Sequence, residues 1–214
     1  MTTTARTTAV THTVPGAMRQ SPIHAVEEAP TVDRDGAIEA VADLLRALGR
    51  DTEAEHLRDT PRRVVDGLLE LLSPPGFTMT TFPNEEGYDD LVLIRDIPFT
   101  SMCEHHMLPF RGVAHVGYIP GERLVGLSKL ARVVDWFARD LQVQERLTTQ
   151  VADHLEVALA PRGVGVVLQA EHLCMSIRGV QAGGASTTTS AFRGELITDI
   201  VRQRRFDVSL NGAV

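Results

Sequence analysis

The sequence Cys103-Glu104-His105-His106, taken with His172-Leu173-Cys174 further along the chain, decides how this protein is interpreted. Its two cysteines each lie within three residues of a histidine. Thiolate and imidazole are the ligands that zinc prefers. Two ligands spaced as Cys-x-x-His can reach one metal from a single short turn. A third ligand from the distant segment would leave the fourth position open, as a catalytic zinc requires. The spacing therefore predicts a metal site with a catalytic zinc.

Two other interpretations of the cysteines stay open at this point: a disulfide, or two inert thiols in the core. A disulfide requires an oxidising compartment, and nothing in the sequence supports one. Histidines so close to both thiols favour the metal over a chance arrangement.

Length, charge and composition exclude several classes of protein. A chain of 214 residues with 43% apolar residues fits one domain with appendages. Its net charge is −7 and it has no basic run, so we expect no binding to nucleic acid. No apolar run is long enough to span a membrane, so no membrane partner is expected either. The Thr-rich stretch before Glu27 lacks the apolar segment of a secretory signal, which predicts a cytoplasmic protein.

Three regions are expected: a disordered tail at 1–30, an N-terminal helical region at 31–80, and the main domain at 81–214. In the helical region, one helix should begin at Asp33 or Asp35 and stop at Gly49. A second should begin at Thr60-Pro61, with the threonine as its cap, and stop at Ser73-Pro74-Pro75-Gly76.

The main domain mixes strand and helix patterns. Strands are expected at 91–99, 110–119, 123–126, 164–170, 175–180 and near 187–200. One helix should follow a cap at Ser128, and another should run from about Gln144 to Leu159. The acidic tract 80–90 should be a solvated loop. This order of elements predicts an α+β domain with an antiparallel sheet covered by helices on one face.

Five motifs stand in a fixed order along 38–194. They are Cys-Glu-His-His at 103–106, Gly-Val-Ala-His-Val-Gly-Tyr-Ile-Pro at 112–120, Gly-Leu-Ser-Lys-Leu-Ala-Arg at 126–132, Gln-Val-Gln-Glu-Arg-Leu-Thr at 142–148, and His-Leu-Cys-Met-Ser-Ile-Arg-Gly-Val at 172–180. Together they resemble the GTP cyclohydrolase I family. The resemblance implies a tunnelling fold, in which an antiparallel sheet carries two helices on one face, assembled into a toroidal homodecamer. It also implies conversion of GTP and water to 7,8-dihydroneopterin triphosphate and formate, the entry step to folate and other pterins.

The resemblance also implies the residues of the site. The Zn2+ ligands would be Cys103, His106 and Cys174. Opening the imidazole ring of guanine needs a nucleophile and a proton for the departing nitrogen, and His172 would be the proton donor with His105 as its partner. The remaining implied residues are Glu145 and Gln144 for guanine, Lys129, Arg132, Arg178 and Arg63 for the triphosphate, and Ser128 for the later sugar rearrangement or only as a helix cap.

Several positions depart from the family pattern. Asp66 stands where some members carry a lysine, Leu141 replaces a proline, and Ala185 stands where a serine is usual. These differences leave open whether the product feeds folate or a specialised pathway such as 7-deazapurine synthesis. Two rival interpretations remain: a catalytically silent zinc-binding module, and another tunnelling-fold enzyme that acts on a pterin or deazapurine. Both His105 and His172 are present, which argues against the silent module, because a closed structural site needs no proton donor.

Overall fold

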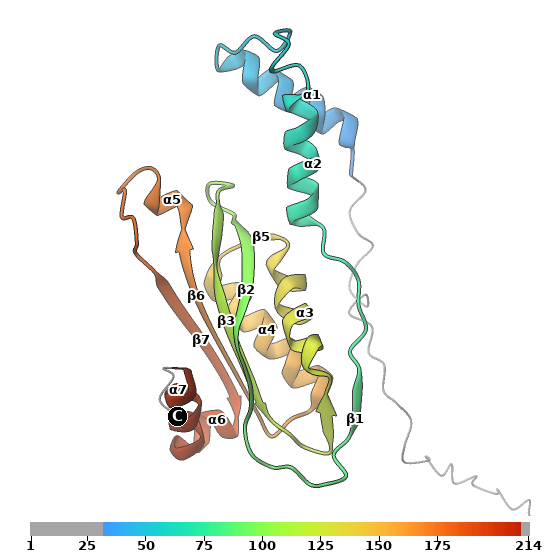
Figure 1. Ribbon diagram of the computed structural model, residues 1–214, viewed down its shortest axis with the longest axis vertical. Helices are drawn as coiled ribbons and strands as arrows, with labels where there is room; N and C mark the ends of the chain where they lie inside the picture. The colour runs from blue at the N-terminus through green and yellow to red at the C-terminus, as the bar shows by residue number, and fades with distance from the viewer. Residues whose placement is uncertain (1–31, 211–214) are drawn as a thin grey trace, which may run out of the picture.

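A five-stranded sheet in the order β5-β2-β3-β6-β7 forms the frame of the protein in this computed structural model (Figure 1). The structure describes residues 32–210, so the tail predicted at 1–30 lies outside the described residues. Neighbouring strands of the five-stranded sheet are antiparallel, except that the short β5 pairs parallel to β2. The elements are α1 Arg34–Ala47, α2 Thr60–Leu72, β1 Thr81–Pro83, β2 Val92–Cys103, β3 Pro109–Ile119, β4 Arg123–Val125, α3 Leu127–Ala138, β5 Leu141–Gln142, α4 Gln144–Leu159, β6 Gly163–His172, α5 Leu173–Ser176, β7 Thr187–Gly194, α6 Glu195–Thr198 and α7 Ile200–Leu210.

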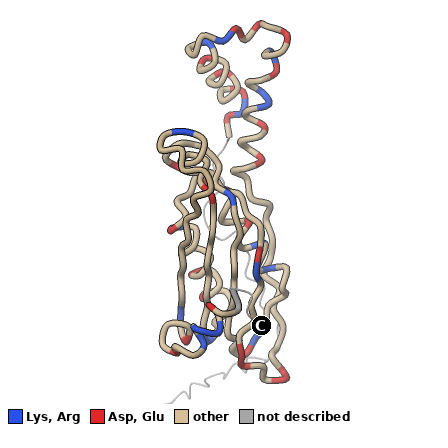
Figure 2. The backbone as a smooth tube through the Cα atoms, turned by 60° about the vertical axis from the view of Figure 1, so that its left-hand side comes forward, with Lys and Arg blue, Asp and Glu red and all other residues tan. Residues whose placement is uncertain are grey.

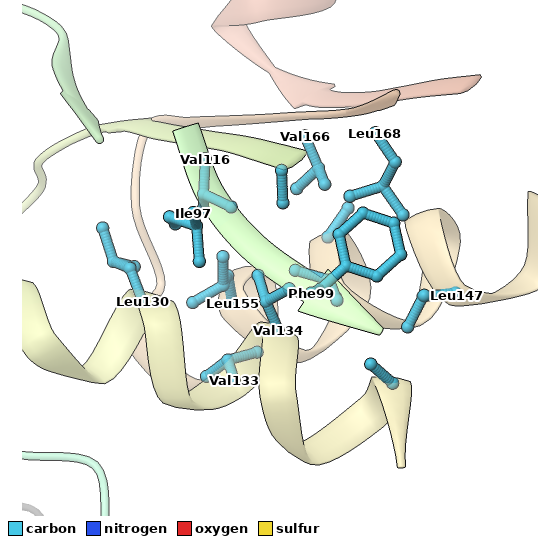
Figure 3. Close-up of a cluster of buried hydrophobic side chains, with 14 of the residues drawn as sticks. Ile97, Phe99, Val116, Leu130, Val133, Val134, Leu147, Leu155, Val166 and Leu168 are labelled. Carbon is cyan, nitrogen blue, oxygen red and sulfur yellow. The ribbon is translucent and has the colours of Figure 1, made fainter. Parts of the chain in front are cut away.

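The main core lies between the sheet and two helices, α3 and α4, that cover one of its faces (Figure 1). Successive side chains of a strand point to opposite faces, so alternate residues of β3, such as Ala114 and Val116, face the helices. Figure 3 shows Phe99 and Val116 of the sheet packed toward Val134 and Leu155 of the helices. Each large apolar side chain buried in this way contributes about 1.5–3 kcal/mol to stability. The predicted α+β fold, with an antiparallel sheet covered by two helices on one face, is confirmed.

The opposite face of the sheet is covered at one end by the C-terminal helices. Phe206 of α7 and Leu196 of α6 are fully buried against Ile119 and Val167. The sequence analysis did not predict α7, because its apolar residues show little concentration on one face and the helix depends on this contact for its packing. No helix among the described residues is long and apolar enough to cross a membrane.

Two of the helix starts, those of α2 and α3, differ from expectation by one or two residues. Asp33 caps α1, as predicted, because its carboxylate accepts a hydrogen bond of 2.9 Å from the Gly36 amide. Thr60 is the first residue of α2 and Asp59 occupies the cap, so the expected threonine cap is wrong. Ser128 is not a cap either, because Gly126 takes that position and Ser128 lies within the first turn of α3.

The strand predictions hold for β2, β3, β4 and β6 and fail near the end of the chain. Residues 175–180 are not a strand: α5 occupies Leu173–Ser176 and turns follow it. The reason is topological, since β7 pairs antiparallel with β6 and the chain between them must reverse direction. The run expected near 187–200 is a strand only to Gly194, which has a positive φ of 58° and turns the chain into α6. The tract 80–90 also contains a short strand, β1, paired with β4.

The first two helices form an arm that projects beyond one end of the sheet (Figure 1). Arg34 of α1 contacts Asp66 of α2 at 2.6 Å, and Arg62 contacts the same carboxylate at 3.4 Å. None of the residues of α1 is buried. Acidic and basic residues are mixed along the arm, without a basic face (Figure 2). The division at 31–80 and 81–214 stays a prediction.

Two glycines give a matched test of this packing. A Cβ added at Gly112 of β3 would lie 1.8 Å from the Gln169 carbonyl oxygen, whereas a Cβ at Gly67 of α2 would meet nothing within 4 Å. Gly112→Ala should therefore destabilise the protein by on the order of 3 kcal/mol, because backbone atoms of β6 would have to move. Gly67→Ala should instead stabilise it by about 0.5–1 kcal/mol, because alanine favours the helix. Thermal unfolding of both variants beside the parent checks this, and equal melting temperatures for the two would contradict the strand packing.

Candidate metal centre and active site

The three predicted metal ligands meet at one end of the sheet. Cys103 is the last residue of β2, and the turn that follows closes with hydrogen bonds from the Met107 amide to the Cys103 carbonyl (2.8 Å) and from the Cys103 amide to the Leu108 carbonyl (2.9 Å). This turn carries His106 back toward Cys103. The pairing of Phe110 on β3 with His172 on β6 brings Cys174 to the same place. The ligand atoms of Cys103, His106 and Cys174 all lie within 4.8 Å of one another.

The donor set fits a zinc ion. Two sulfurs and one imidazole nitrogen, with bonds of about 2.3 Å and 2.0–2.1 Å to a tetrahedral zinc, would lie roughly 3.5–4 Å apart. The three ligand atoms, all within 4.8 Å of one another, lie close to that geometry. Among the described residues this trio is the one His, Cys, Asp or Glu group close enough to hold a metal, so no fourth protein ligand closes the site. Both cysteines are free, which excludes the disulfide interpretation.

The electrostatics of the two thiols also favour a cation. Burial raises the pKa of the Cys174 thiol, the neighbouring Cys103 sulfur raises it further, and Arg178 opposes both effects. Two thiolates at this separation repel each other in a partly buried site. A divalent cation between them would reverse this preference and hold both sulfurs deprotonated.

His172 lies beside the trio with its ring fixed on two sides. It stacks on Phe110 with the ring centroids 4.6 Å apart and the planes nearly parallel. Its Nε2 atom lies 2.8 Å from Oε1 of Gln144, the first residue of α4. Burial lowers the pKa of His172, and the Glu145 carboxylate partly opposes that shift. The imidazole of His172, the predicted proton donor, is therefore fixed in orientation and lies near the Glu145 carboxylate.

Other predicted residues gather around this group. Glu145 and Arg178 are close enough to affect the charges of His172 and Cys174, respectively. His105 lies in the turn after Cys103, with its ring 6.4 Å from that of His106 and its Nε2 atom 3.8 Å from Glu104. His115, which the sequence analysis left without a role, is buried in β3, where its Nδ1 accepts a hydrogen bond from the Asp96 amide.

The remaining predicted residues lie elsewhere in the chain. β3 begins at the metal centre, and its 11 residues carry the chain roughly 35 Å to the other end of the sheet. α3 follows that far end by way of β4, and Ser128, Lys129 and Arg132 lie in its first turns, outside the metal-binding group. Arg63 lies on the arm, paired with Asp59 at 3.1 Å. Asp66, noted as a departure from the family, pairs with Arg34 in the same arm.

Sequence reasoning missed several residues that support the site. Phe110 stacks on His172, and Thr148 and Thr189 extend the contacts of Gln144. Arg146 of α4 contacts Glu104 at 2.5 Å and so ties the metal-binding turn to the helix. A charged residue within the motif at 142–148 could have suggested Arg146, but no pattern in the sequence points to the threonines.

The model of the family described as GTP cyclohydrolase I matches residues 37–210. The chain is 52% identical over 178 residues to the GTP cyclohydrolase 1 of Allorhizobium ampelinum, covering 81% of this chain and 89% of that protein. It is 53% identical over 176 residues to the GTP cyclohydrolase 1 of Mycolicibacterium gilvum, a match that covers 79% of this chain and 87% of that protein. A crystal structure of the archaeosine synthase QueF-Like in the apo form is 18% identical to this chain, with a TM-score of 0.41. The match covers 49% of this chain and 94% of that chain, and the two structures are only distantly similar.

The family model spans the metal-binding turn, both helices over the sheet and the strand that ends at His172. The two relatives are similar to this chain over most of their own length. The chain belongs to the GTP cyclohydrolase I family.

Proposed function

We propose that this protein is a zinc-dependent hydrolase that converts GTP and water to 7,8-dihydroneopterin triphosphate and formate. The observation that carries the proposal is the convergence of Cys103, His106 and Cys174 beside His172 in a chain of this family. A silent zinc module is less well supported, because such a site is closed by four protein ligands. Here the described residues supply three, and a histidine stands next to them.

The residues of the chain have distinct tasks in this proposal. A bound zinc ion supplies Lewis acidity, which makes water an effective nucleophile toward C8 of guanine at neutral pH. His172 supplies a proton to the nitrogen that departs as the ring opens. Glu145 accepts hydrogen bonds from the N1–H and 2-amino groups of guanine, both of which are donors. His105 lies beside His106 in the turn and assists in proton transfer.

The phosphate contacts lead us to propose an oligomer. Lys129 and Arg132 lie in the first turns of α3, which follows the end of β3 that is remote from the metal centre, so we infer that one chain does not bring them to the GTP at its own metal centre. A neighbouring copy can, if its α3 meets the metal end of the first chain. We therefore propose that the active form is a homo-oligomer, the decamer implied by the family, in which Ser128, Lys129 and Arg132 of one chain complete the site of the next. Arg178 and Arg63 would complete the triphosphate contacts.

The cellular setting is part of the same proposal. We propose a cytoplasmic enzyme at the entry to folate and pterin synthesis, with 7-deazapurine synthesis as the alternative for its product. The domain division, with 81–214 as the catalytic domain and 31–80 as a helical region, is also proposed. The projection of α1 and α2 beyond the sheet supports that division.

The metal can be tested by one substitution. Cys174→Ser should lower the bound zinc from about one ion per chain to a small fraction and abolish formate release, because a neutral hydroxyl is a poor zinc ligand. Zinc content by mass spectrometry and formate release from GTP measure the two effects. Full activity in thoroughly chelated, metal-free parent protein would show that the proposal is wrong.

Proton transfer is tested by His172→Ala. This variant should keep its zinc but release formate on the order of 10²-fold more slowly, the usual scale for a positioned acid–base group. His56→Ala is the matched control, because His56 is an exposed histidine outside the main domain. Loss of zinc from the His172 variant would identify this histidine as a ligand and contradict the assignment.

The shared site is tested by mixing two defective chains. Cys174→Ser lacks the metal end of the site and Lys129→Ala lacks the phosphate end. When the two chains are dissociated, mixed equally and reassembled, a site formed by two subunits should recover about a quarter of the parent activity, because one pairing in four is intact. Reassembly of each variant alone is the control. If the mixture is no more active than its two components, both groups belong to one chain and the proposed assembly is wrong.

A further inference from the structure

The Gln144 side chain is buried, with 1% of the residue exposed, and its amide group contacts four partners. Nε2 lies 3.1 Å from the Leu168 carbonyl oxygen, 3.0 Å from the Thr187 carbonyl oxygen and 3.1 Å from the Thr189 hydroxyl. Oε1 lies 2.8 Å from Nε2 of His172. A side chain enclosed in this way is poorly placed to contact guanine, which is the role that family resemblance implied.

Two of these contacts fix which end of the amide is the donor. A backbone carbonyl can only accept a hydrogen bond, so both the Leu168 and Thr187 oxygens require an N–H. Rotating the Gln144 amide by half a turn would place its own oxygen against both carbonyls and leave three acceptors facing one another without a proton. The amide nitrogen must therefore face the strands, and Oε1 must face His172.

The threonine hydroxyls agree with this orientation. Thr148 Oγ1 lies 2.7 Å from the Gln144 backbone carbonyl, to which it must donate its single proton. The bond of 2.6 Å between the Thr148 and Thr189 hydroxyls must then take its proton from Thr189. Thr189 in turn has a lone pair left to accept from Gln144 Nε2. The two Nε2 protons of Gln144 are shared among three acceptors on β6 and β7, and none of the three contacts calls for the amide oxygen instead.

We propose that Gln144 is a positioning residue that holds neutral His172 in the tautomer protonated at Nε2. An amide oxygen can only accept, so the 2.8 Å contact requires an N–H on the histidine. A neutral imidazole has one N–H, and the lone pair is then on Nδ1. Stacking on Phe110 holds the ring plane, so the bond to Gln144 also fixes which way Nδ1 points. In the reaction proposed above, Nδ1 of neutral His172 would first accept a proton from the attacking water and then give it to the departing nitrogen of guanine.

The tautomer can be measured without any reaction. Nitrogen NMR of the zinc-loaded parent protein, labelled with 15N-histidine and held near pH 8 where an ordinary imidazole is neutral, separates the protonated from the unprotonated ring nitrogen. The two nitrogen signals that couple to the His172 ring protons should be those of a protonated Nε2 and an unprotonated Nδ1. A protonated Nδ1 on His172 would overturn the proposal. Because this measurement needs neither GTP nor turnover, it can fail or succeed independently of the proposed function.

A substitution separates positioning from substrate contact. Gln144→Met keeps the length of the side chain but removes the acceptor for His172. We expect kcat to fall by about 10- to 100-fold through loss of orientation, while KM for GTP changes by less than about twofold. The His172 nitrogen signals should also become a mixture of tautomers. Gln150→Met is the matched control on the same helix, because the amide of Gln150 contacts Gln142 and not a histidine.

The outcomes are distinct. A kcat loss together with tautomer mixing supports the positioning role. A large rise in KM with kcat and the tautomer unchanged would show that Gln144 binds guanine directly, and would overturn the proposal. If Gln144→Met does not fold, Thr189→Val gives a second test, because it removes one acceptor of the amide while leaving both carbonyls. That variant should keep the tautomer, and a switch to protonated Nδ1 would contradict the two-carbonyl argument.

Discussion

The antiparallel pairing of β3 with β6 is the constraint on which the rest of the site depends. Its register sets Phe110 opposite His172, and so places the end of β6 beside the turn that joins β2 to β3. That single juxtaposition brings a cysteine and a histidine from one turn to a cysteine that follows them by about seventy positions in the chain. The glycine at 112 permits the close approach of the strands there. A shift of one residue would turn His172 to the other face of the sheet.

The polar groups beneath the metal centre are as constrained as the metal ligands. Gln144, Thr148 and Thr189 are buried or partly buried, and an unsatisfied polar group in such a place costs about 1–3 kcal/mol. Their hydrogen bonds join α4 to β6 and β7 and end on His172. The same bonds that satisfy the buried amide therefore orient the imidazole. These contacts therefore hold α4 on the sheet and orient His172 at the same time.

Much of the fold and the metal-binding group of Cys103, His106 and Cys174 could be predicted from the sequence, for physical reasons. Alternation of apolar residues predicts β2, β3 and β6, and Cys-x-x-His spacing predicts a metal because few side chains bind zinc. The strand expected at 175–180 was wrong because Met175 in α5 and Ile177 just after it are exposed apolar residues where the chain reverses, and alternation alone cannot distinguish such a segment from a strand. Contacts such as Phe110 with His172 depend on strand register, which no local pattern records. The separation of Lys129 from the metal centre is likewise a property of the fold.

In the proposed site, two sulfurs and one imidazole from two distant segments bind one zinc ion and leave a position open. X-ray absorption at the zinc edge of the metal-loaded protein tests this most directly, because it counts the atoms bound to the metal. We expect two sulfur atoms at about 2.3 Å, one histidine nitrogen at about 2.0–2.1 Å, and one further light atom from solvent. Four sulfur atoms, or none, would contradict it, since the first would place the metal between chains and the second would place it outside this site.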